Sequence, residues 1–402
     1  MPDEHPGHES EGFRTPSRAA AYRGWSGPAL QDGQTHGHAP APDGYHLPAA
    51  APLGNAADAP GTWVSPCWSP PLAASEIIPS WEIDSDPGTW ALIEVRAFRA
   101  EGSPTRWYAL GRWAAATEAG TSPRGTFPDQ ADTDARVLTD TLRCTADRPF
   151  SGVQLRITLH RERPGAAITL RGAGLLASTL PGPLPETSVP LRNTSVDLPV
   201  PQLSQQLHRD EYPEYNGGGG AWCSATSTAM VLAYWGTGPD PSDLEGVEAP
   251  NGDPEVVAVV RRVYDYAYNG AGNWAFNTAY AATRGLRAHV SRLQDLTAAE
   301  RLIRAGIPVP VSVSFTETEL PEAGYATEGH LLVIRGFTEV GDVIVNDPAA
   351  PDNRQVRRVY PRGAFERVWL RGSGGAAYLE RPADRPLPPL EGPLGVSAAA
   401  SD

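Results

Sequence analysis

The sequence predicts an all-β domain followed by a domain of mixed helices and strands, an α+β arrangement, and three observations carry this expectation. Residues 59–180 contain short runs in which apolar and polar residues alternate, as in Ala91-Leu-Ile-Glu-Val-Arg-Ala-Phe. Residues 198–381 mix helix-like and strand-like segments. A stretch rich in Pro separates the two regions at 181–197. Each region is long enough to form a domain of its own.

The alternation in residues 59–180 is typical of strands with one buried face, because successive side chains of a strand point to opposite faces. About seven runs read as strands, among them 89–98, 137–144 and 152–161. Turn signals such as Asp86-Pro-Gly separate these runs. Several short strands without a convincing helix predict a β-sandwich.

Three segments are expected to lie outside the two domains. Residues 1–58 are rich in Pro, Gly, Ala, Ser and His without periodicity, so they cannot bury enough apolar surface to offset the entropy of ordering. We predict a disordered tail there, and a second one at 382–402, where Pro, Ala and Ser return. The segment 181–197 is interpreted as a stiff linker, because its prolines cannot continue a sheet.

The charge and the apolar segments narrow the class of protein. The formal net charge of −14 argues against a nucleic-acid binder, which needs a basic face. No segment approaches the ~20 apolar residues that span a bilayer. The first thirty or so residues contain acidic residues and no apolar core of a secretory signal. A cytoplasmic location is therefore expected, with export left open, and no cofactor or metal motif is recognised.

The chain has three cysteines, Cys67, Cys144 and Cys223, so at least one thiol is unpaired. Cys67 and Cys144 lie in the β-rich region and could pair with each other. We favour instead two small buried thiols. Cys223 lies in a different sequence context, which suggests a reactive thiol.

Cys223 follows the run Gly217-Gly-Gly-Gly-Ala-Trp and opens a helix predicted for residues 224–235. The dipole and the free N–H groups at a helix start favour a thiolate and lower the thiol pKa. The same N–H groups can also donate to an oxyanion. A small structural cysteine at a helix start is an equally good interpretation of this segment alone.

A thiol nucleophile needs a base within hydrogen-bond reach. His330 opens an apolar strand, and Asp347 directly follows the next strand. Two adjacent antiparallel strands would bring both side chains together, and the carboxylate would then fix the imidazole tautomer. Asn346 is a neighbouring alternative, although strand alternation directs it to the other face. Taken singly, both His330 and Asp347 are more often structural.

An amide side chain upstream of the nucleophile could complete an oxyanion hole. The segment Val200-Pro-Gln-Leu-Ser-Gln-Gln offers three candidates. We prefer Gln205 and keep Gln202 and Gln206 as alternatives.

The C-terminal half resembles the C39-like cysteine peptidases of the papain superfamily, in particular their stand-alone bacterial branch. The resemblance covers most of 198–381 and implies a papain-like fold, with Cys223 as nucleophile, His330 as base, Asp347 as its orienting partner and Gln205 as oxyanion donor. Five stretches carry it, in family order: Val200-Pro-Gln-Leu-Ser-Gln, Ala221-Trp-Cys-Ser-Ala-Thr-Ser-Thr-Ala-Met-Val-Leu-Ala-Tyr-Trp-Gly, Gly272-Asn-Trp-Ala-Phe-Asn, Gly329-His-Leu-Leu-Val-Ile-Arg-Gly-Phe and Gly341-Asp-Val-Ile-Val-Asn-Asp-Pro-Ala-Ala.

The β-rich region is similar to the accessory domain that often precedes this peptidase module, through Ser80-Trp-Glu-Ile-Asp and Arg106-Trp-Tyr-Ala-Leu-Gly-Arg-Trp. Transporter-fused relatives cut leader peptides after a double glycine. This sequence has no transmembrane span or nucleotide-binding motif, so that substrate is not carried over.

These observations predict a cysteine peptidase that hydrolyses peptide bonds of a peptide or protein substrate through a Cys-His-Asp triad and an acyl-enzyme. One alternative is an acyl or peptidyl transferase on the same triad. Another is a glycan- or protein-binding protein with an inactive peptidase domain. Its β-domain would use Trp107, Tyr108 and Trp113 to stack on sugar rings, although such residues more often belong to a core.

Overall fold

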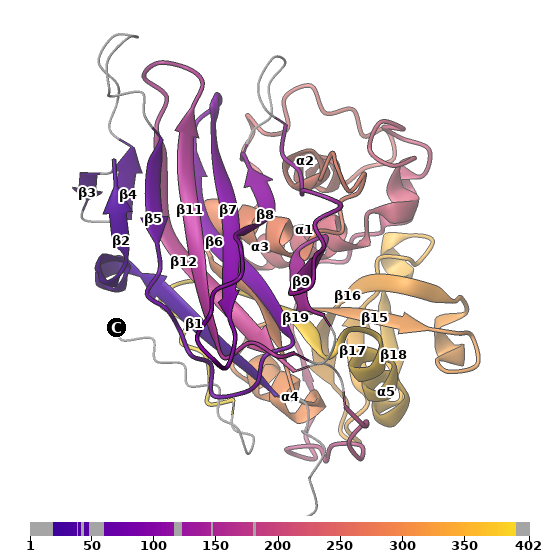
Figure 1. Cartoon of the computed structure of the whole chain (residues 1–402). Coiled ribbons are helices and arrows are strands. Elements are labelled where there is room, and N and C mark those ends of the chain that lie inside the picture. Colours follow the sequence, from indigo (N-terminus) through magenta and orange to yellow (C-terminus); the bar gives the residue numbers. More distant parts are fainter. Residues whose placement is uncertain are drawn as a thin grey trace, which may run out of the picture.

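The computed structural model describes residues 19–37, 39–41, 44–47, 60–115, 123–145, 148–179 and 182–390. Within these residues, two antiparallel sheets form the N-terminal part, and a third sheet with five α-helices forms the C-terminal part (Figure 1). The protein is therefore rich in sheet, with an N-terminal β domain, as the sequence predicts. None of the described helices is both long and apolar enough to cross a membrane.

The two N-terminal sheets enclose a common apolar core. The first has the strand order β3-β4-β12-β6-β10-β9, with β1 paired to β12, and the second has the order β2-β5-β11-β7-β8. The strands of the first are β1 (Ala20–Ser26), β3 (Ala39–Ala41), β4 (Gly44–Leu47), β6 (Glu76–Ser85), β9 (Ala135–Leu138), β10 (Thr141–Cys144) and β12 (Ile168–Ser178). Those of the second are β2 (Gln34–His36), β5 (Gly61–Val64), β7 (Thr89–Phe98), β8 (Tyr108–Trp113) and β11 (Gly152–Arg161).

The alternating pattern of β7 explains how this core forms. Ala91, Ile93, Val95 and Ala97 point inward and are fully buried, while the residues between them are half-buried on the outer face. Such alternation lets one face of a strand pack against the opposing sheet.

The core continues into the C-terminal part through three aromatic rings. Trp81 and Trp113 meet edge to face with centroids 6.1 Å apart, and each ring also contacts Phe276. Phe276 lies in helix α3 (Trp274–Thr283) of the C-terminal part. The two halves of the chain therefore share one continuous apolar core.

The predicted disordered tail over 1–58 is wrong for residues 20–37, 39–41 and 44–47. Strand β1 pairs with β12 along its full length, from Ala20 opposite Ser178 to Ser26 opposite Gly172. The 3-10 helix η1 (Gly27–Asp32) follows, and Trp25 and Leu30 are buried in the core. Backbone pairing to β12 thus stabilises a segment without apolar periodicity. The remaining parts of the predicted tail, at 1–18, 38, 42–43 and 48–58, lie outside the described residues.

Two further expectations need correction. The run 137–144 is not one strand but the hairpin β9–β10, which turns at Thr139 and Asp140. Cys67 and Cys144 are not joined by a disulfide, but Cys67 is exposed, so only Cys144 is the buried thiol that we expected.

The three aromatic residues named for sugar stacking do not form a platform together. Tyr108 and Trp113 are fully buried in the core. Trp107 is half-buried, with the guanidinium of Arg96 4.7 Å and that of Arg156 4.3 Å from its ring centroid. Its ring is therefore already covered by cation–π contacts within the protein.

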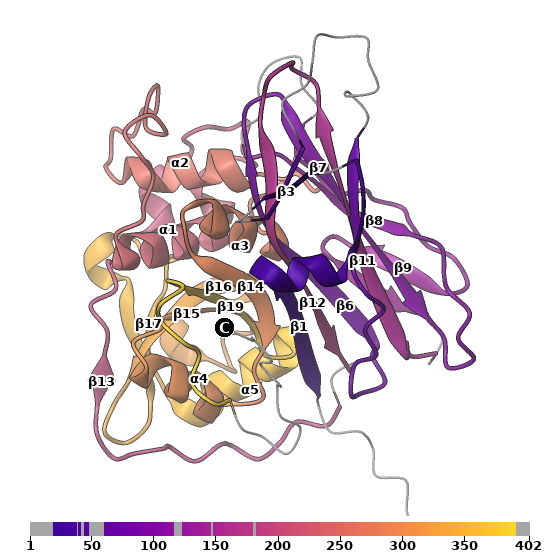
Figure 2. The ribbon, with the colours of Figure 1, turned by 90° about the vertical axis from the view of Figure 1, so that its left-hand side faces the viewer.

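The C-terminal sheet has the order β14-β19-β15-β16-β17-β18, with β13 paired to β16. Helices α1 to α3 lie on one side of it, and α4 and α5 lie on the other (Figure 2). The helices are α1 (Cys223–Trp235), α2 (Pro254–Val263), α3, α4 (Leu296–Arg304) and α5 (Arg362–Ser373). The strands are β13 (Val196–Asp197), β14 (Arg287–Arg292), β15 (Val309–Phe315), β16 (Thr327–Phe337), β17 (Val343–Asn346), β18 (Arg357–Tyr360) and β19 (Ala376–Arg381).

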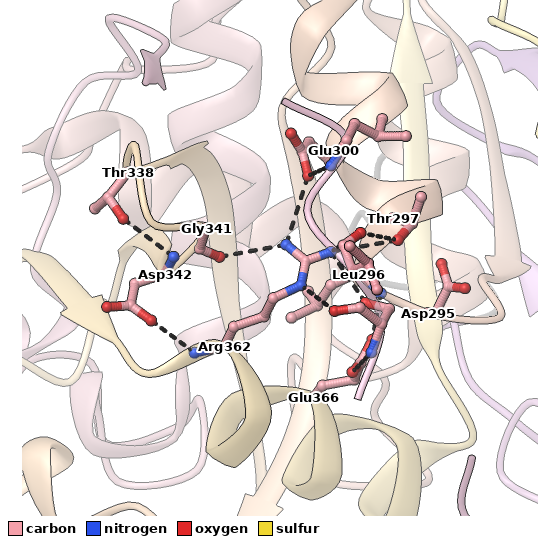
Figure 3. Close-up of polar contacts among 12 residues, drawn as sticks. Asp295, Leu296, Thr297, Glu300, Thr338, Gly341, Asp342, Arg362 and Glu366 are labelled. Carbon is pink, nitrogen blue, oxygen red and sulfur yellow. Dashed lines mark hydrogen bonds and ion pairs between the residues drawn. The ribbon is translucent and has the colours of Figure 1, made fainter. Parts of the chain in front are cut away.

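The segment predicted as a linker is extended but firmly held. Ser188 N donates to Glu366 Oε2 at 2.7 Å, and Leu191 N donates to Glu300 Oε2 at 3.0 Å. Arg362 Nε in turn donates to the carbonyl of Ser188 at 2.8 Å. We call Arg362, Glu300 and Glu366 the Arg362 cluster (Figure 3), and all three are buried. The end of the predicted linker is strand β13, which pairs with β16. Of the second predicted tail, residues 391–402 lie outside the described residues.

Candidate active site

Cys223 is the first residue of α1, and only Ala221 and the N-cap Trp222 separate it from the glycine run at 217–220. Gly217 and Gly218 have φ angles of 75° and 90°, which favour glycine. A Cβ on Gly219 would lie 2.0 Å from the carbonyl oxygen of Gln205, so only glycine allows this close approach. The run therefore brings the segment of Gln205 against the start of the helix.

Helix α1 is almost entirely buried, from Ser224 to Leu232. Its buried residues are small or apolar and none is charged, so the helix can pack on all sides. Its N-terminus is tied down further by a 2.8 Å hydrogen bond between Ser224 Oγ and the hydroxyl of Tyr378 in β19. The position of Cys223 is thus fixed by the core.

The thiol of Cys223 is half-buried and electrostatically activated. Burial alone would raise its pKa, but the positive charge of His330 and a hydrogen bond from its ring lower the pKa below the usual value for a thiol. The backbone N–H groups of Leu331 and Ser224 lower the pKa further, because they donate to the sulfur. The thiolate is the form that these contacts favour.

His330 lies in the first half of β16 and is 5 % exposed. Its Nε2 lies 2.9 Å from Asp347 Oδ1. Burial would lower the pKa of this imidazole, but the negative charges of Asp347 and Cys223 and its hydrogen bonds to both raise the pKa well above the usual value. Because Asp347 occupies Nε2, Nδ1 is the ring nitrogen that can serve the thiol.

Asp347 follows β17 and is fully buried, and several donors hold its carboxylate. Oδ2 accepts hydrogen bonds from the hydroxyls of Tyr325 at 2.9 Å and Tyr360 at 2.8 Å. Oδ1 accepts from Ala349 N at 3.0 Å in addition to the imidazole. Burial would raise the pKa of the carboxyl, but His330 and these donors lower the pKa to about 2. Asp347 is therefore ionised at neutral pH.

Asn346, the alternative to Asp347, points elsewhere. Its Nδ2 donates to the carbonyls of Val200 at 3.2 Å and Pro201 at 2.8 Å, and its Oδ1 accepts from Arg335 Nη1 at 3.1 Å. It thereby holds the extended segment that leads to Gln205, and its amide binds these partners instead of the imidazole.

Of the three glutamines, only Gln205 is both buried and part of the wall of the cavity that Cys223 lines. It begins the 3-10 helix η3 (Gln205–His208), is 3 % exposed and lines the same cavity as Cys223. Its Nε2 donates to the carbonyl of Gly220 at 3.0 Å. Gln202 instead accepts from Arg357 N, and Gln206 lines the cavity but accepts from Arg209.

Cys223, His330 and Gln205 line one cavity of about 1180 Å³. Tyr268, whose side chain is largely open to solvent, also lines it. Partial burial raises the pKa of the Tyr268 hydroxyl, as do the charges of Asp140 and Cys223, which places this tyrosine near both. An extended peptide could reach the thiol through a cavity of this size.

The sequence did not indicate several of these residues. Tyr325 and Tyr360 hold Asp347 from two separate segments, and no motif connects them to it. Asp140 belongs to the N-terminal part, yet it also lines the cavity. Only the tertiary fold brings these residues to the site.

Two family models match the chain. Residues 22–178 match the Peptidase C39 N-terminal domain, and residues 197–377 match the Peptidase_C39 like family. Together the two matches cover most of the chain, which therefore belongs to the C39-like peptidase family. The first match begins within β1, in agreement with the pairing of that strand to β12.

The likeness to solved structures is weaker. A proposed C39-like peptidase from Bacillus anthracis is 21 % identical, with 46 % of this chain and 96 % of that chain covered and a TM-score of 0.29. A structure of infectious bursal disease virus, Gt strain, is 13 % identical, with 44 % and 36 % covered and a TM-score of 0.22. No curated protein matches the chain.

Proposed function

We propose that the protein is a cysteine peptidase that hydrolyses peptide bonds on a papain-like domain, with Cys223 as nucleophile, His330 as base and acid, and Asp347 as the residue that orients the histidine. The observation that carries the proposal is the continuous contact from Asp347 through His330 to a thiol that opens into a large cavity. Membership of the C39-like peptidase family supports the same reaction class.

The first half of the proposed reaction forms an acyl-enzyme. The Cys223 thiolate attacks the carbonyl carbon of the scissile bond, and the carbonyl π electrons move to oxygen. His330, protonated on Nδ1, then gives this proton to the leaving nitrogen as the C–N bond breaks. The first product leaves as an amine, and the acyl group remains on sulfur as a thioester.

The second half hydrolyses the thioester. Neutral His330 takes a proton from water, whose oxygen attacks the thioester carbonyl. The C–S bond breaks, the carboxylic acid leaves, and the thiolate–imidazolium pair is restored. Asp347 keeps the imidazole in the required tautomer and stabilises its charged form, as its 2.9 Å bond to Nε2 permits.

We propose that Gln205 and the backbone N–H of Cys223 bind the oxyanion. A side-chain amide carries two N–H groups, so Gln205 can donate to Gly220 and still offer a second donor. Its burial beside the cavity and its bond to Gly220 hold this amide in place, and Gly219 packs against the backbone carbonyl of Gln205. Preorganised donors of this kind stabilise the developing charge without reorganisation.

The same arrangement supports the domain layout that the sequence suggests, with a correction at its start. The accessory β-sandwich extends from β1 rather than from residue 59, and the peptidase domain occupies about residues 198–381. A peptide or protein is the proposed substrate.

The test is digestion of a complex peptide mixture by the purified chain, with new termini identified by mass spectrometry. Wild-type protein should produce new termini that Cys223→Ala does not, and added glycinamide should not be incorporated into the products. Loss of cleavage should amount to about 10³-fold or more, because the nucleophile is removed. Equal cleavage by both proteins would overturn the proposal, and glycinamide-capped products would identify a transferase instead.

A further inference from the structure

The N-terminal part contributes one wall of the cavity at Cys223. This wall consists of the β9–β10 hairpin and the first residue of β6: Leu138, Thr139, Asp140, Thr141, Arg143 and Glu76. Thr139 has a φ of 53°, which a β-branched residue rarely adopts. Such a conformation persists only where surrounding contacts determine it. The hairpin is thus held in a fixed place beside the proposed nucleophile.

Two contacts anchor the hairpin wall to the C-terminal part. Asp140 Oδ2 accepts a hydrogen bond from Trp274 N, at the start of α3, at 2.8 Å. Its Oδ1 accepts from the hydroxyl of Thr141 at 3.0 Å. Arg292 of β14 pairs with Glu76 at 2.6 Å. Both oxygens of Asp140 are therefore engaged in holding the wall, and its side chain is buried.

Arg143 is the accessible charge on this wall. Its Nε donates to Glu76 at 2.7 Å, so Glu76 receives two guanidinium groups, one from Arg143 and one from Arg292. Asp140 is the second carboxylate of this wall, and both of its oxygens are engaged. The side chain of Arg143 is 33 % exposed, against 9 % for Arg292 and 2 % for Glu76. Of these charged groups, the guanidinium of Arg143 is therefore the one most open to the cavity.

The C-terminal part lines the cavity with two further arginines, Arg209 and Arg358. Arg209 donates to the amide oxygen of Gln206, and Arg358 donates to the carbonyl of Ala323, so these bonds leave their charges unbalanced. In all, four arginines and three carboxylates line the cavity. The chain as a whole has a net charge of −14, so the cavity differs in sign from the rest of the protein. Such a local field draws anionic groups toward it.

We infer that Arg143 is a specificity-determining residue, which binds a carboxylate of the peptide substrate. A guanidinium presents five donors in a planar fork, so Arg143 can hold Glu76 and still bind a second carboxylate. The inference rests on the proposed peptidase function. The carboxylate can come from an acidic side chain or from the peptide's own C-terminus, and the experiment separates these two sources.

The experiment measures how well short peptides protect Cys223 from iodoacetamide. Three peptides serve as probes: acetyl-Ala-Ala-Glu-Ala-Ala-amide, the same peptide with Gln in place of Glu, and that Gln peptide with a free C-terminal carboxylate. Labelling of Cys223 is read by mass spectrometry of its own tryptic peptide, so that Cys67 and Cys144 do not interfere.

In the wild-type protein, we expect at least one carboxylate peptide to protect at about fivefold lower concentration than the neutral peptide. Protection by the Glu peptide alone identifies side-chain recognition, and protection by the free carboxylate alone identifies recognition of the C-terminus. Arg143→Gln should abolish this advantage, and Arg143→Lys should restore part of it. Arg292 still pairs with Glu76 in these variants, and thermal unfolding checks that they fold.

Arg136→Gln is the matched control, because Arg136 lies directly opposite Arg143 in the hairpin but does not line the cavity. It should keep the full preference for carboxylate peptides. The inference is overturned if the wild type protects equally with all three peptides, or if Arg143→Gln and Arg136→Gln behave alike. Because protection requires no turnover, the two failures are distinguishable: a chain that cleaves nothing but prefers carboxylate peptides would refute the proposed peptidase and leave Arg143 as a carboxylate-binding residue of the cavity only.

Discussion

Two buried groups of charged residues in the C-terminal part differ in what surrounds them. In the Arg362 cluster, the guanidinium donates to Glu300, to Ser188 and to the carbonyl of Gly341 (Figure 3). Burial lowers the pKa of Arg362, while the two glutamates raise it. The cluster serves to hold the linker, and none of its three members lines the cavity at Cys223.

The group of charged residues at Cys223 differs because it reaches a cavity. Asp347 is as buried as Glu300, but the chain of contacts ends at a half-buried thiol on a cavity wall. The comparison teaches that buried charge alone does not mark a functional site. What distinguishes the proposed site is that its chain of contacts ends at the Cys223 thiol, where a substrate atom can make the next contact.

The sharpest way to break this comparison is to neutralise Asp347 in one group and, beside the Arg362 cluster, the carboxylate of Asp342, which accepts a hydrogen bond from Arg362 N. Asp347→Asn should lower kcat by about 10²- to 10⁴-fold, because the amide can present N–H to Nε2 and favours the wrong tautomer. The matched variant Asp342→Asn, which weakens a bond to the backbone of Arg362, should keep its activity per folded molecule. Turnover of a peptide identified in the digestion assay measures both. Equal losses in the two variants would contradict the distinction.

The Arg362 cluster should contribute to the stability of the protein instead. Glu300→Gln should lower the free energy of unfolding by about 3 kcal/mol, because it leaves Arg362 and Arg304 without their buried carboxylate. The exposed Glu322→Gln should change it by less than about 0.5 kcal/mol. Urea unfolding gives both values. A stable Glu300→Gln protein with reduced kcat would show that the Arg362 cluster serves catalysis after all.

A smaller effect tests the donors around Asp347. Tyr360→Phe removes one of two hydroxyls that bind Oδ2, so kcat/KM should fall by about fivefold. Tyr234→Phe removes a comparable bond to the carbonyl of Gly306, away from the site, and should leave kcat/KM unchanged. An unchanged value in Tyr360→Phe would mean that Tyr325 alone holds the carboxylate.

The sequence predicted much of the sheet structure, because alternation of apolar residues is a local signal. Strands such as β7 and β11 follow it closely. Strand β1 escaped prediction, since backbone pairing to β12 rather than its own pattern stabilises it. The turn of the β9–β10 hairpin was missed because Thr139 adopts a positive φ without a turn motif.

The candidate site could be predicted only in part. Family motifs and the order of two adjacent strands pointed to Cys223, His330 and Asp347, and the fold brings them together. The roles of these residues remain proposals. The wall formed by Arg143 and Asp140 could not be foreseen, because it depends on how the N-terminal sheets pack against α3.

The most direct test of the central claim is the rate of alkylation by iodoacetamide as a function of pH, resolved for each cysteine. The lowered pKa of Cys223 should keep its labelling fast below the usual thiol pKa of ~8.5, with a decline only as the pH falls through the lowered value. Cys67 is an internal control, because partial burial raises the pKa of its thiol and its labelling should rise only at alkaline pH.

His330→Ala should abolish the difference in labelling between Cys223 and Cys67, because it removes the charge and the hydrogen bond that lower the pKa of Cys223. Fast labelling of Cys223 near pH 6 in the wild type, lost in His330→Ala, is the result that the thiolate–imidazolium pair predicts. Labelling of Cys223 that rises together with that of Cys67, whatever residue occupies position 330, would contradict it.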